Sequence, residues 1–561
     1  MGFSAQAFFE RSVFLPRPQG VNLARQDAGL YEFIHRIDTG YTYWNLAITP
    51  SYEQSFGCAI ARQLIGASNT MIFSGSRVED RAKTDILADY VGLPADFKST
   101  VTFSPLMRTF VLDFDWYVGF DEWCEGFYMR LYSPVVYTQW NLTMCEDVTS
   151  AGTALYPAGY LGPQRLEADD LLHSVAAAFK GDFTFGDMRE PLAYGRICGS
   201  QSLVNMADLR LLFGYDFTRQ EKYTFGVEFF MQLPTSKPAG AKYLFQPQIG
   251  NGGHWEFGFG FCGEVAFWHS DDESSLGLFL FDSAISHLCK SHFLRSYDLR
   301  NNGPGSRYML LEEVADPSID LFVGNGGPVA SNQYKQRLLP AINVTTFDTS
   351  INIAVQADIA LRVAFYKDAW NLEVGYKLFA RSAENLICRD TFAGNIYAVK
   401  GDAQVYGFDN VSNVPIAVNA TQSSATLYGG QGVGNFTTGE LFKNINADNP
   451  AIAASDNGPL EQLDATDGPL FGGQGPINLS NPALLLAHSD INECSGLAPH
   501  AISNTLFIHT GYTGQECHNY IPYIGVGAEV EVVPGCMTGT LCNTNGASAQ
   551  WGVWIKGGVA Y

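Results

Sequence analysis

Charged side chains are scarce in this sequence. They make up 16% of its 561 residues, compared with roughly 25% in an ordinary soluble domain. The charges that do occur are unbalanced, with 34 basic and 57 acidic residues and a formal net charge of −23. Nucleic acid and anionic lipid headgroups would be repelled, so neither is expected as a direct partner. The acidity either keeps exposed loops soluble or forms a cation-attracting surface, depending on where the carboxylates lie.

Long apolar runs and catalytic motifs are also missing. No apolar run reaches ten residues, which excludes a membrane-spanning helix. The chain has no GxSxG, HExxH or P-loop motif and no GxGxxG that follows a strand, and its histidines are dispersed. The sequence therefore predicts no enzyme activity, no cofactor and no metal site.

The 11 cysteines are scattered, without a CxxC pair or the spacing of a zinc site. This distribution fits an oxidising compartment, unless several cysteines are simply small buried apolar residues. The N-terminus lacks the apolar core of a signal peptide, because Glu10, Arg11 and Arg17 interrupt it. The protein is then either cytosolic or numbered from a removed signal peptide, and the cysteines and strands favour the second alternative.

Helical periodicity is confined to two short segments. In the N-terminal segment, residues 1–40, the apolar residues Val21, Leu23, Leu30, Phe33 and Ile34 have roughly helical spacing. We expect a short amphipathic helix there. A second helix is expected over Glu167–Lys180.

Nearly all other periodic segments alternate between apolar and polar residues. The longest covers Ile351–Phe365 and continues through a turn into Trp370–Leu378, which predicts a hairpin. Further alternating segments are Thr109–Phe120, Gly126–Ser133, Asp208–Phe217, Tyr223–Leu233, His254–His269 and Tyr523–Val533. Such lengths exceed those of ordinary soluble strands and suit a tilted bilayer crossing. We therefore expect an all-β protein over residues 41–561, an antiparallel transmembrane β-barrel of about 16 strands (roughly 14–18). A soluble β-sandwich or jelly roll is the alternative.

The alternation stops between Gly401 and Ala501. This stretch is rich in Asn, Gly, Ala, Ser and Asp and is far longer than an ordinary loop. Because long loops of such barrels lie on the outer side, we interpret it as a long surface loop or one folded into the lumen.

The polar face of the predicted strands would line a pore. Its charged residues are Asp113, Asp115, Arg130, Asp208, Arg210, Asp216, Glu228, Glu256, Glu264, Asp358, Arg362, Glu373, Lys377, Glu529, Glu531 and Lys556. Acidic residues prevail, and charged rings of one sign set the selectivity of pores. A cation-preferring pore is therefore expected, unless opposite charges neutralise each other across the barrel.

A disulfide is predicted between Cys536 and Cys542, just before the last strand. Five residues separate them, including a glycine, and turn-forming residues follow. Cys494 and Cys517 are the next candidate pair. Both cysteines of the first pair could instead stay reduced or bond to other chains.

The end of the chain resembles the C-terminal strand of bacterial outer-membrane barrels. Trp551, Val553, Ile555 and Val559 alternate with small or polar residues before the terminal Tyr561. The resemblance implies recognition by the barrel-assembly machinery. The segments Ser12–Ala24 (SVFLPRPQGVNLA), Gly305–Leu311 (GSRYMLL) and Gln550–Gly558 (QWGVWIKGG) are similar to paralogous outer-membrane proteins of Dependentiae-type intracellular bacteria, and more distantly to porins of chlamydia-like bacteria. That resemblance covers most of the chain apart from Gly401–Ala501.

These features predict a porin-like barrel in the outer membrane of a bacterial cell, with its signal peptide removed. It would let small solutes and ions diffuse passively, support the cell envelope, or do both. Outer-membrane lipid and further copies of the chain, as a homotrimer, are the expected partners. A secreted or surface shell protein or adhesin without a pore is the alternative.

Overall fold

The computed structural model describes residues 20, 22–36, 40–57, 60–61, 69–78, 81–82, 84–156, 161, 168–271, 274–314, 334–401, 407–408, 415–416, 425–428, 485–534 and 546–561. Within them, twelve strands form a closed antiparallel barrel in which each strand pairs with the next along the chain and the last pairs with the first. The barrel strands are β1 (Thr42–Ser55), β5 (Leu106–Phe120), β6 (Phe127–Asn141), β9 (Leu209–Gln220), β10 (Tyr223–Leu233), β11 (Glu256–His269), β12 (Ser275–Ser296), β16 (Thr346–Lys367), β17 (Trp370–Arg381), β23 (Ala501–Thr513), β24 (Ile521–Val532) and β25 (Gln550–Ala560).

The barrel thus has fewer strands than the sixteen or so that the sequence suggested. Two further strands, β8 (Ser200–Met206) and β18 (Glu384–Arg389), pair with β6 and β16 outside the ring. The prediction was too high because it spread barrel strands over most of residues 41–561. Long stretches between the barrel strands fold outside the ring instead.

The alternation of apolar and polar residues predicted the strands well. On β16 and β17, Phe365, Leu372 and Val374 are exposed, while Arg362 and Glu373 are buried. The apolar face therefore points outward and the polar face points into the lumen. This arrangement is the reverse of a soluble sandwich, in which the apolar face is the buried one, and it explains why these strands carry so many exposed aromatic residues.

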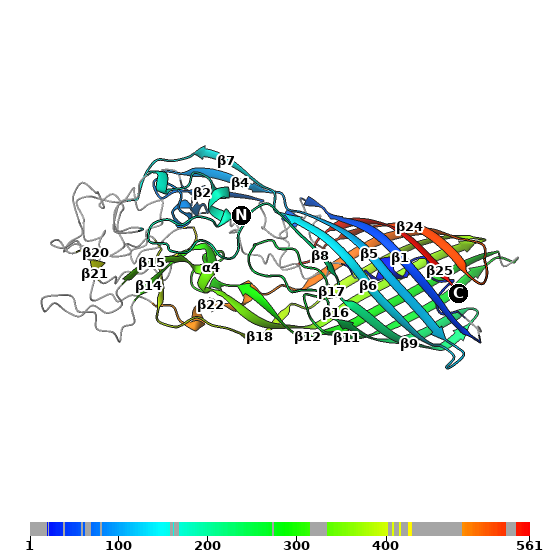
Figure 1. Ribbon diagram of the computed structural model, residues 1–561. Helices are drawn as coiled ribbons and strands as arrows, with labels where there is room; N and C mark the ends of the chain where they lie inside the picture. Colours follow the sequence, from blue (N-terminus) through cyan, green and yellow to red (C-terminus); the bar gives the residue numbers. More distant parts are fainter. Residues whose placement is uncertain are drawn as a thin grey trace, which may run out of the picture.

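The two ends of the barrel differ in the length of their connections. At one end, called the turn end, short turns such as 221–222 and 368–369 join the strands, and β25 stops there at the C-terminus. At the other end, long connections form a second body of structure, called the cap (Figure 1). In Figure 1 the barrel lies on the right, with the C-terminus at its far end, and the cap strands lie on the left.

The cap contains small sheets and short helices. Its strands are β2 (Thr70–Ser74), β3 (Ile86–Leu87), β4 (Lys98–Phe103) and β7 (Met144–Ser150) in one sheet; β14 (Leu310–Val314), β15 (Tyr334–Pro340) and β19 (Tyr397–Val399) in a second; and the pairs β13 (Asp298–Leu299) with β22 (Ile491–Asn492) and β20 (Gly407–Phe408) with β21 (Pro415–Ile416). Its helical turns are α3 (Val175–Lys180), α4 (Ala341–Val344) and the 3-10 turns Ala88–Val91, Ala168–Asp170, Ser306–Tyr308, His488–Asp490 and Glu493–Gly496.

A single hydrophobic core holds the cap together. Phe73, Phe97, Phe179 and Tyr308 are buried in it, although they come from three separate connections between barrel strands. Some described parts of the predicted surface loop also belong to it, because Ala425, Leu427, Leu486 and Ile491 are buried there. Those parts of Gly401–Ala501 therefore pack into the cap.

Both predicted helices are shorter than expected. The first, α1, covers only Leu23–Asp27, and α3 covers only the end of the second. Leu30, Phe33 and Ile34 are buried against the inner barrel wall without being helical. Their spacing therefore reflects contacts with the wall. Among the described residues, no helix is long and apolar enough to cross a membrane.

The predicted disulfide between Cys536 and Cys542 lies outside the described residues. The eight described cysteines all carry free thiols. Cys494 and Cys517, the second predicted pair, are among them, so that pairing is not seen.

Two neighbouring carboxyls on β14 have opposite environments. Glu312 is fully buried and neither carboxyl oxygen has a hydrogen-bond partner. Burial raises its pKa well above the usual range, and the charge of Lys400 offsets this only in part. Glu313 is also partly buried, but its bonds to Lys335 and Arg337, at 3.1 and 2.6 Å, outweigh that burial and lower its pKa. The two residues should therefore give the cap opposite pH dependences.

We expect Glu312 to destabilise the cap as the pH rises from 5 to 8. A carboxyl whose pKa is raised by folding favours the folded state at low pH and loses that contribution as the pH passes its folded pKa. Hydrogen exchange of β14 should therefore become faster relative to the intrinsic rate at higher pH, and Glu312→Gln should flatten this trend. Glu313→Gln is the matched control. It should instead remove a stabilisation that is lost at acidic pH. An unchanged pH profile in Glu312→Gln would contradict this assignment.

Candidate functional site

The charged residues predicted to line a pore all lie at or near the inner face of the barrel. Of the sixteen, thirteen are buried, and Glu228, Glu264 and Asp358 are partly exposed. Their position on the inner face follows the alternation of the strands, and a pore-lining role stays a prediction. Their surroundings differ from those of an open pore, because the lumen holds another part of the chain.

Residues Asn22–Arg36, called the plug, run through the lumen. The plug begins with α1 and ends at the turn end, where the Arg36 guanidinium lies 3.5 Å from the carbonyl oxygen of Tyr561. Twelve strands leave a wider interior than the eight-stranded barrels whose own side chains fill them. A segment of helical width, about 10–12 Å with its side chains, is of the right size to occupy that interior.

Arg25 is the central charged contact of the plug. Its Nε donates to the Asp113 carboxylate at 2.6 Å, a second nitrogen bonds to Glu53, and a third donates to the carbonyl oxygen of Gly20 at 2.8 Å. The side chain is 1% exposed. A buried guanidinium is tolerated only when it is paired and hydrogen-bonded in this way. Arg25 therefore connects the plug to β1 and β5.

Asp27 connects the plug to two arginines of the barrel wall. Its carboxylate accepts a hydrogen bond from Arg130 at 2.6 Å, and Arg130 Nε also donates to Asp115 at 2.8 Å. The Asp27 carbonyl accepts from Arg362 at 2.8 Å, and Arg362 lies 3.2 Å from Glu373. Basic residues of the wall thus bond both to the plug and to acidic neighbours on the wall.

Backbone carbonyl groups at the end of α1 accept hydrogen bonds from a lysine of the barrel wall. Lys556 donates to the carbonyl oxygens of Gln26 and Ala28 at 2.9 and 2.6 Å, at a helix C-terminus, where carbonyl groups lack intrahelical partners. Arg130 also donates to the Gln26 carbonyl, at 3.2 Å. Gly29 follows with φ +75°, and a Cβ there would lie 2.3 Å from His509 Nε2. Only glycine fits this close passage along β23.

Aromatic side chains close the turn end around residues Leu30–Arg36. Phe33 stacks on Tyr523 with ring centroids 4.2 Å apart, and His35 contacts the rings of Tyr117 and Tyr128. Inner-face glycines make room for these rings, since a Cβ on Gly558 would lie 2.2 Å from the Tyr523 hydroxyl. The plug therefore packs against aromatic rings at the turn end as well as bonding to charged side chains of the barrel wall.

The plug makes hydrogen bonds or ion pairs to most of the barrel. The strands concerned are β1, β5, β6, β9, β16, β17, β23, β24 and β25. Among the predicted pore-lining charges, Asp113 and Arg130 pair with opposite charges of the plug and Asp216 bonds to His35. The plug contacts of Arg362, Glu373, Glu529 and Lys556 are hydrogen bonds to backbone groups or to Asn22. Others are satisfied by neutral donors: Asp208 accepts from Ser236 at 2.9 Å, and Glu531 accepts from Gln550 at 3.0 Å.

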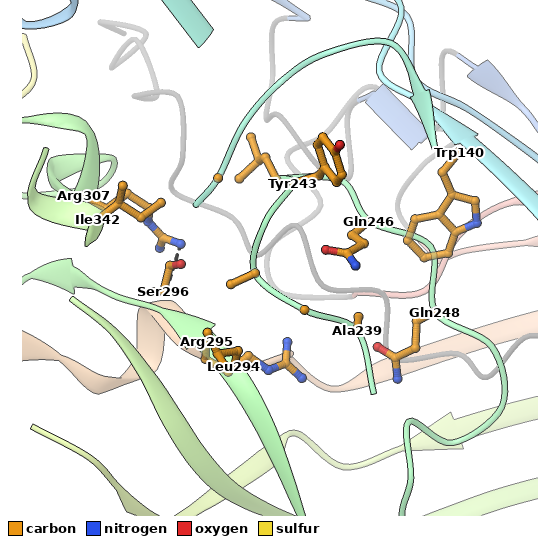
Figure 2. A pocket seen from close by; sticks show the side chains of 14 residues that line it. Trp140, Ala239, Tyr243, Gln246, Gln248, Leu294, Arg295, Ser296, Arg307 and Ile342 are labelled. Atoms are coloured by element: carbon orange, nitrogen blue, oxygen red, sulfur yellow. Dashed lines mark hydrogen bonds between the residues drawn. The ribbon is translucent and has the colours of Figure 1, made fainter. Parts of the chain in front are cut away.

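A small cavity lies where the cap meets the barrel. It has a volume of about 40 Å³ and is lined by Trp140 at the end of β6, by the segment 239–248, and by Arg295, Arg307 and Ile342. Figure 2 shows Gln246, Tyr243 and Gln248 around the same space. This volume suits a few water molecules rather than an organic solute.

The sequence did not reveal the plug. Its apolar residues were recognised, but Arg25, Gln26 and Asp27 were not, although three consecutive polar residues inside an apolar pattern are a signal for a polar surrounding. Their partners are wall residues such as Asp113 and Arg130, far along the chain. Pairing of this kind cannot be deduced from one sequence.

No protein-family model and no curated protein sequence matches the chain. Among solved structures, it is similar to an outer membrane channel from Pseudomonas putida F1, with 6% identity over 92% of this chain and 96% of that one and a TM-score of 0.32. It is also similar to a FadL homologue from Pseudomonas aeruginosa, with 7% identity over 93% and 90% and a TM-score of 0.25. The transport unit of the autotransporter AIDA-I from Escherichia coli shares 6% identity over 96% and 95%, with a TM-score of 0.21.

These similarities are too low to carry an argument about function. They do not support the resemblance to proteins of Dependentiae-type or chlamydia-like bacteria.

Proposed function

We propose that the protein is a gated channel of a bacterial outer membrane, closed in the described state by its own N-terminal plug. The barrel's apolar outer face suits contact with outer-membrane lipid, and its closed ring leaves no unpaired strand edge there. Short turns of such barrels face the periplasm and long connections face outward. The turn end is then periplasmic and the cap lies on the cell surface.

One observation supports gating most directly. The plug is held by side-chain hydrogen bonds and ion pairs, and the wall residues that hold it are hydrophilic. If the plug withdraws, water can fill the lumen because its wall is charged. A lumen lined by apolar residues would not hold water in this way. Passive diffusion, as expected from the sequence, then requires an open state.

The second candidate is a permanently closed anchor that displays the cap, as a shell protein or adhesin would. The separate hydrophobic core of the cap favours it. In that case the plug never leaves the lumen. Recognition of the C-terminal strand by the assembly machinery, and association as a trimer, are compatible with both proposals.

Thiol labelling distinguishes the two candidates. Ser51 lies on the inner face of β1 and is 4% exposed, so the thiol introduced by Ser51→Cys is protected while the plug is in place. The native Cys124, exposed in a turn at the turn end, provides an internal control for full reactivity. With a charged, membrane-impermeant reagent and peptide mapping, a gated channel should label the new thiol completely but on the order of 100-fold more slowly than Cys124, through transient opening. If Cys124 reacts fully and the new thiol never does, the anchor is correct.

A further inference from the structure

Three potential metal ligands from distant parts of the chain meet near the turn end of the lumen. His35 comes from the plug, Asp216 from β9 and Cys262 from β11. His35 Nδ1 lies 2.9 Å from one Asp216 carboxylate oxygen, and the other oxygen lies 4.0 Å from Cys262 Sγ. All three ligand atoms lie within 4.8 Å of one another.

The surroundings of this cluster are acidic. Glu264 and Asp282 line the same small cavity as His35 and Cys262. Glu228 is connected through Tyr128, whose hydroxyl lies 3.0 Å from the Glu228 carboxylate and 3.4 Å from Cys262 Sγ.

Arg362, which lines this cavity, pairs with only one of these acids. Arg362 lines the cavity but already bonds to Asp282 and Glu373. Asp282 is therefore paired, whereas Asp216, Glu228 and Glu264 gather around the His35 imidazole. Buried carboxylates are costly without a cation, and a bound divalent ion supplies the largest local positive charge a site can have.

A glycine keeps space open at the cluster. Gly226 of β10 lies opposite, and a Cβ there would be 2.4 Å from an Asp216 oxygen and 2.8 Å from Cys262 Sγ. The adjoining cavity has a volume of about 30 Å³, enough for a water molecule as a further ligand. In a tetrahedral zinc site, bonds of about 2.0–2.3 Å place ligand atoms about 3.3–3.7 Å apart. The distances of the cluster bracket this range, so shifts of about 1 Å complete the site.

We propose that His35, Asp216 and Cys262 bind a divalent transition metal such as Zn²⁺. Imidazole, carboxylate and thiolate together suit a borderline-soft ion, whereas Ca²⁺ and Mg²⁺ take oxygen ligands. On binding, the Cys262 thiol gives its proton to solvent and its sulfur bonds to the metal. The ion would fasten the plug to β9 and β11. This proposal does not depend on whether the barrel conducts.

The test uses Co²⁺ as a spectroscopic probe of the full-length protein, purified metal-free in detergent. Because Cys517 Sγ lies 3.2 Å from His518 Nδ1 on the surface, the parent for all measurements carries Cys517→Ser. We expect one Co²⁺ per chain with a thiolate-to-cobalt charge-transfer band. Cys262→Ser should abolish the band, and His35→Ala should weaken binding by at least about 100-fold. Cys289→Ser, at a thiol outside the cluster, should change neither.

A second measurement does not rely on any variant at the site. X-ray absorption of the zinc-loaded parent should show one sulfur among nitrogen and oxygen ligands. No stoichiometric binding, a band that persists in Cys262→Ser, or a zinc shell without sulfur would each overturn the proposal.

Discussion

Removing residues 1–36 is expected to turn a closed barrel into an open, cation-preferring channel. The shortened chain keeps all twelve strands and loses the plug, which bonds to nine of them. In planar bilayers, we expect conductance to rise roughly tenfold or more over the full chain, because a twelve-stranded lumen without a filling segment is wide enough for water and ions. The full chain itself should be mostly silent.

The selectivity of the shortened chain follows from the charges left on the wall. Deletion of the plug takes Arg25 away from Asp113 and Glu53, so those two carboxylates face the lumen without their main partner. Reversal potentials in a salt gradient should therefore indicate cation preference. A heat-dependent shift in gel mobility verifies that the shortened barrel is folded. A folded barrel that stays silent would contradict gating by the plug, and anion preference would contradict the charge argument.

Arg25→Met is expected to open the channel without deleting anything. Methionine fills a similar volume but leaves Asp113 and Glu53 buried without a cation in the closed state, whereas water solvates them in the open state. Breaking one side of a buried ion pair costs about 3–5 kcal/mol. The equilibrium between closed and open states should therefore shift toward opening by about 10²- to 10⁴-fold, measured as open probability in single-channel records.

The matched control lies in the same plug. Arg36 is partly exposed, and its side-chain hydrogen bonds, to Tyr41 and to the Tyr561 carbonyl, are long at 3.5 Å. Arg36→Met should leave the open probability nearly unchanged. Arg25→Lys should fall between the two, because a lysine keeps the charge but cannot reproduce the fork of bonds to both carboxylates. Equal open probabilities in Arg25→Met and Arg36→Met would show that the ion pairs do not hold the plug.

The strands could be predicted from sequence because each of their side chains faces either the lipid or the lumen. Lipid lies outside and a polar lumen inside, so the alternation over Tyr223–Leu233 predicted β10 to the residue. The strand number could not be predicted in this way. Whether a segment such as Lys98–Phe103 joins the ring or the cap depends on its partners, which the sequence does not reveal.

The site was predictable only in part for the same reason. Alternation placed Asp113, Arg130 and Glu373 on the inner face, but it could not show what faces them. Beyond α1 the plug is not helical, and the helical spacing of Leu30 and Phe33 reflects packing against the barrel wall instead. The charge balance of the lumen therefore depends on partners that are hundreds of residues apart, such as Asn22 and Glu529, which bond at 2.7 Å.

A density map of the full-length protein in a lipid nanodisc tests the central claim most directly. We expect continuous density inside the barrel for residues 22–36, with Arg25 between Glu53 and Asp113 and Phe33 stacked on Tyr523. A water-filled lumen, with this segment outside the barrel, would contradict the closed-channel account.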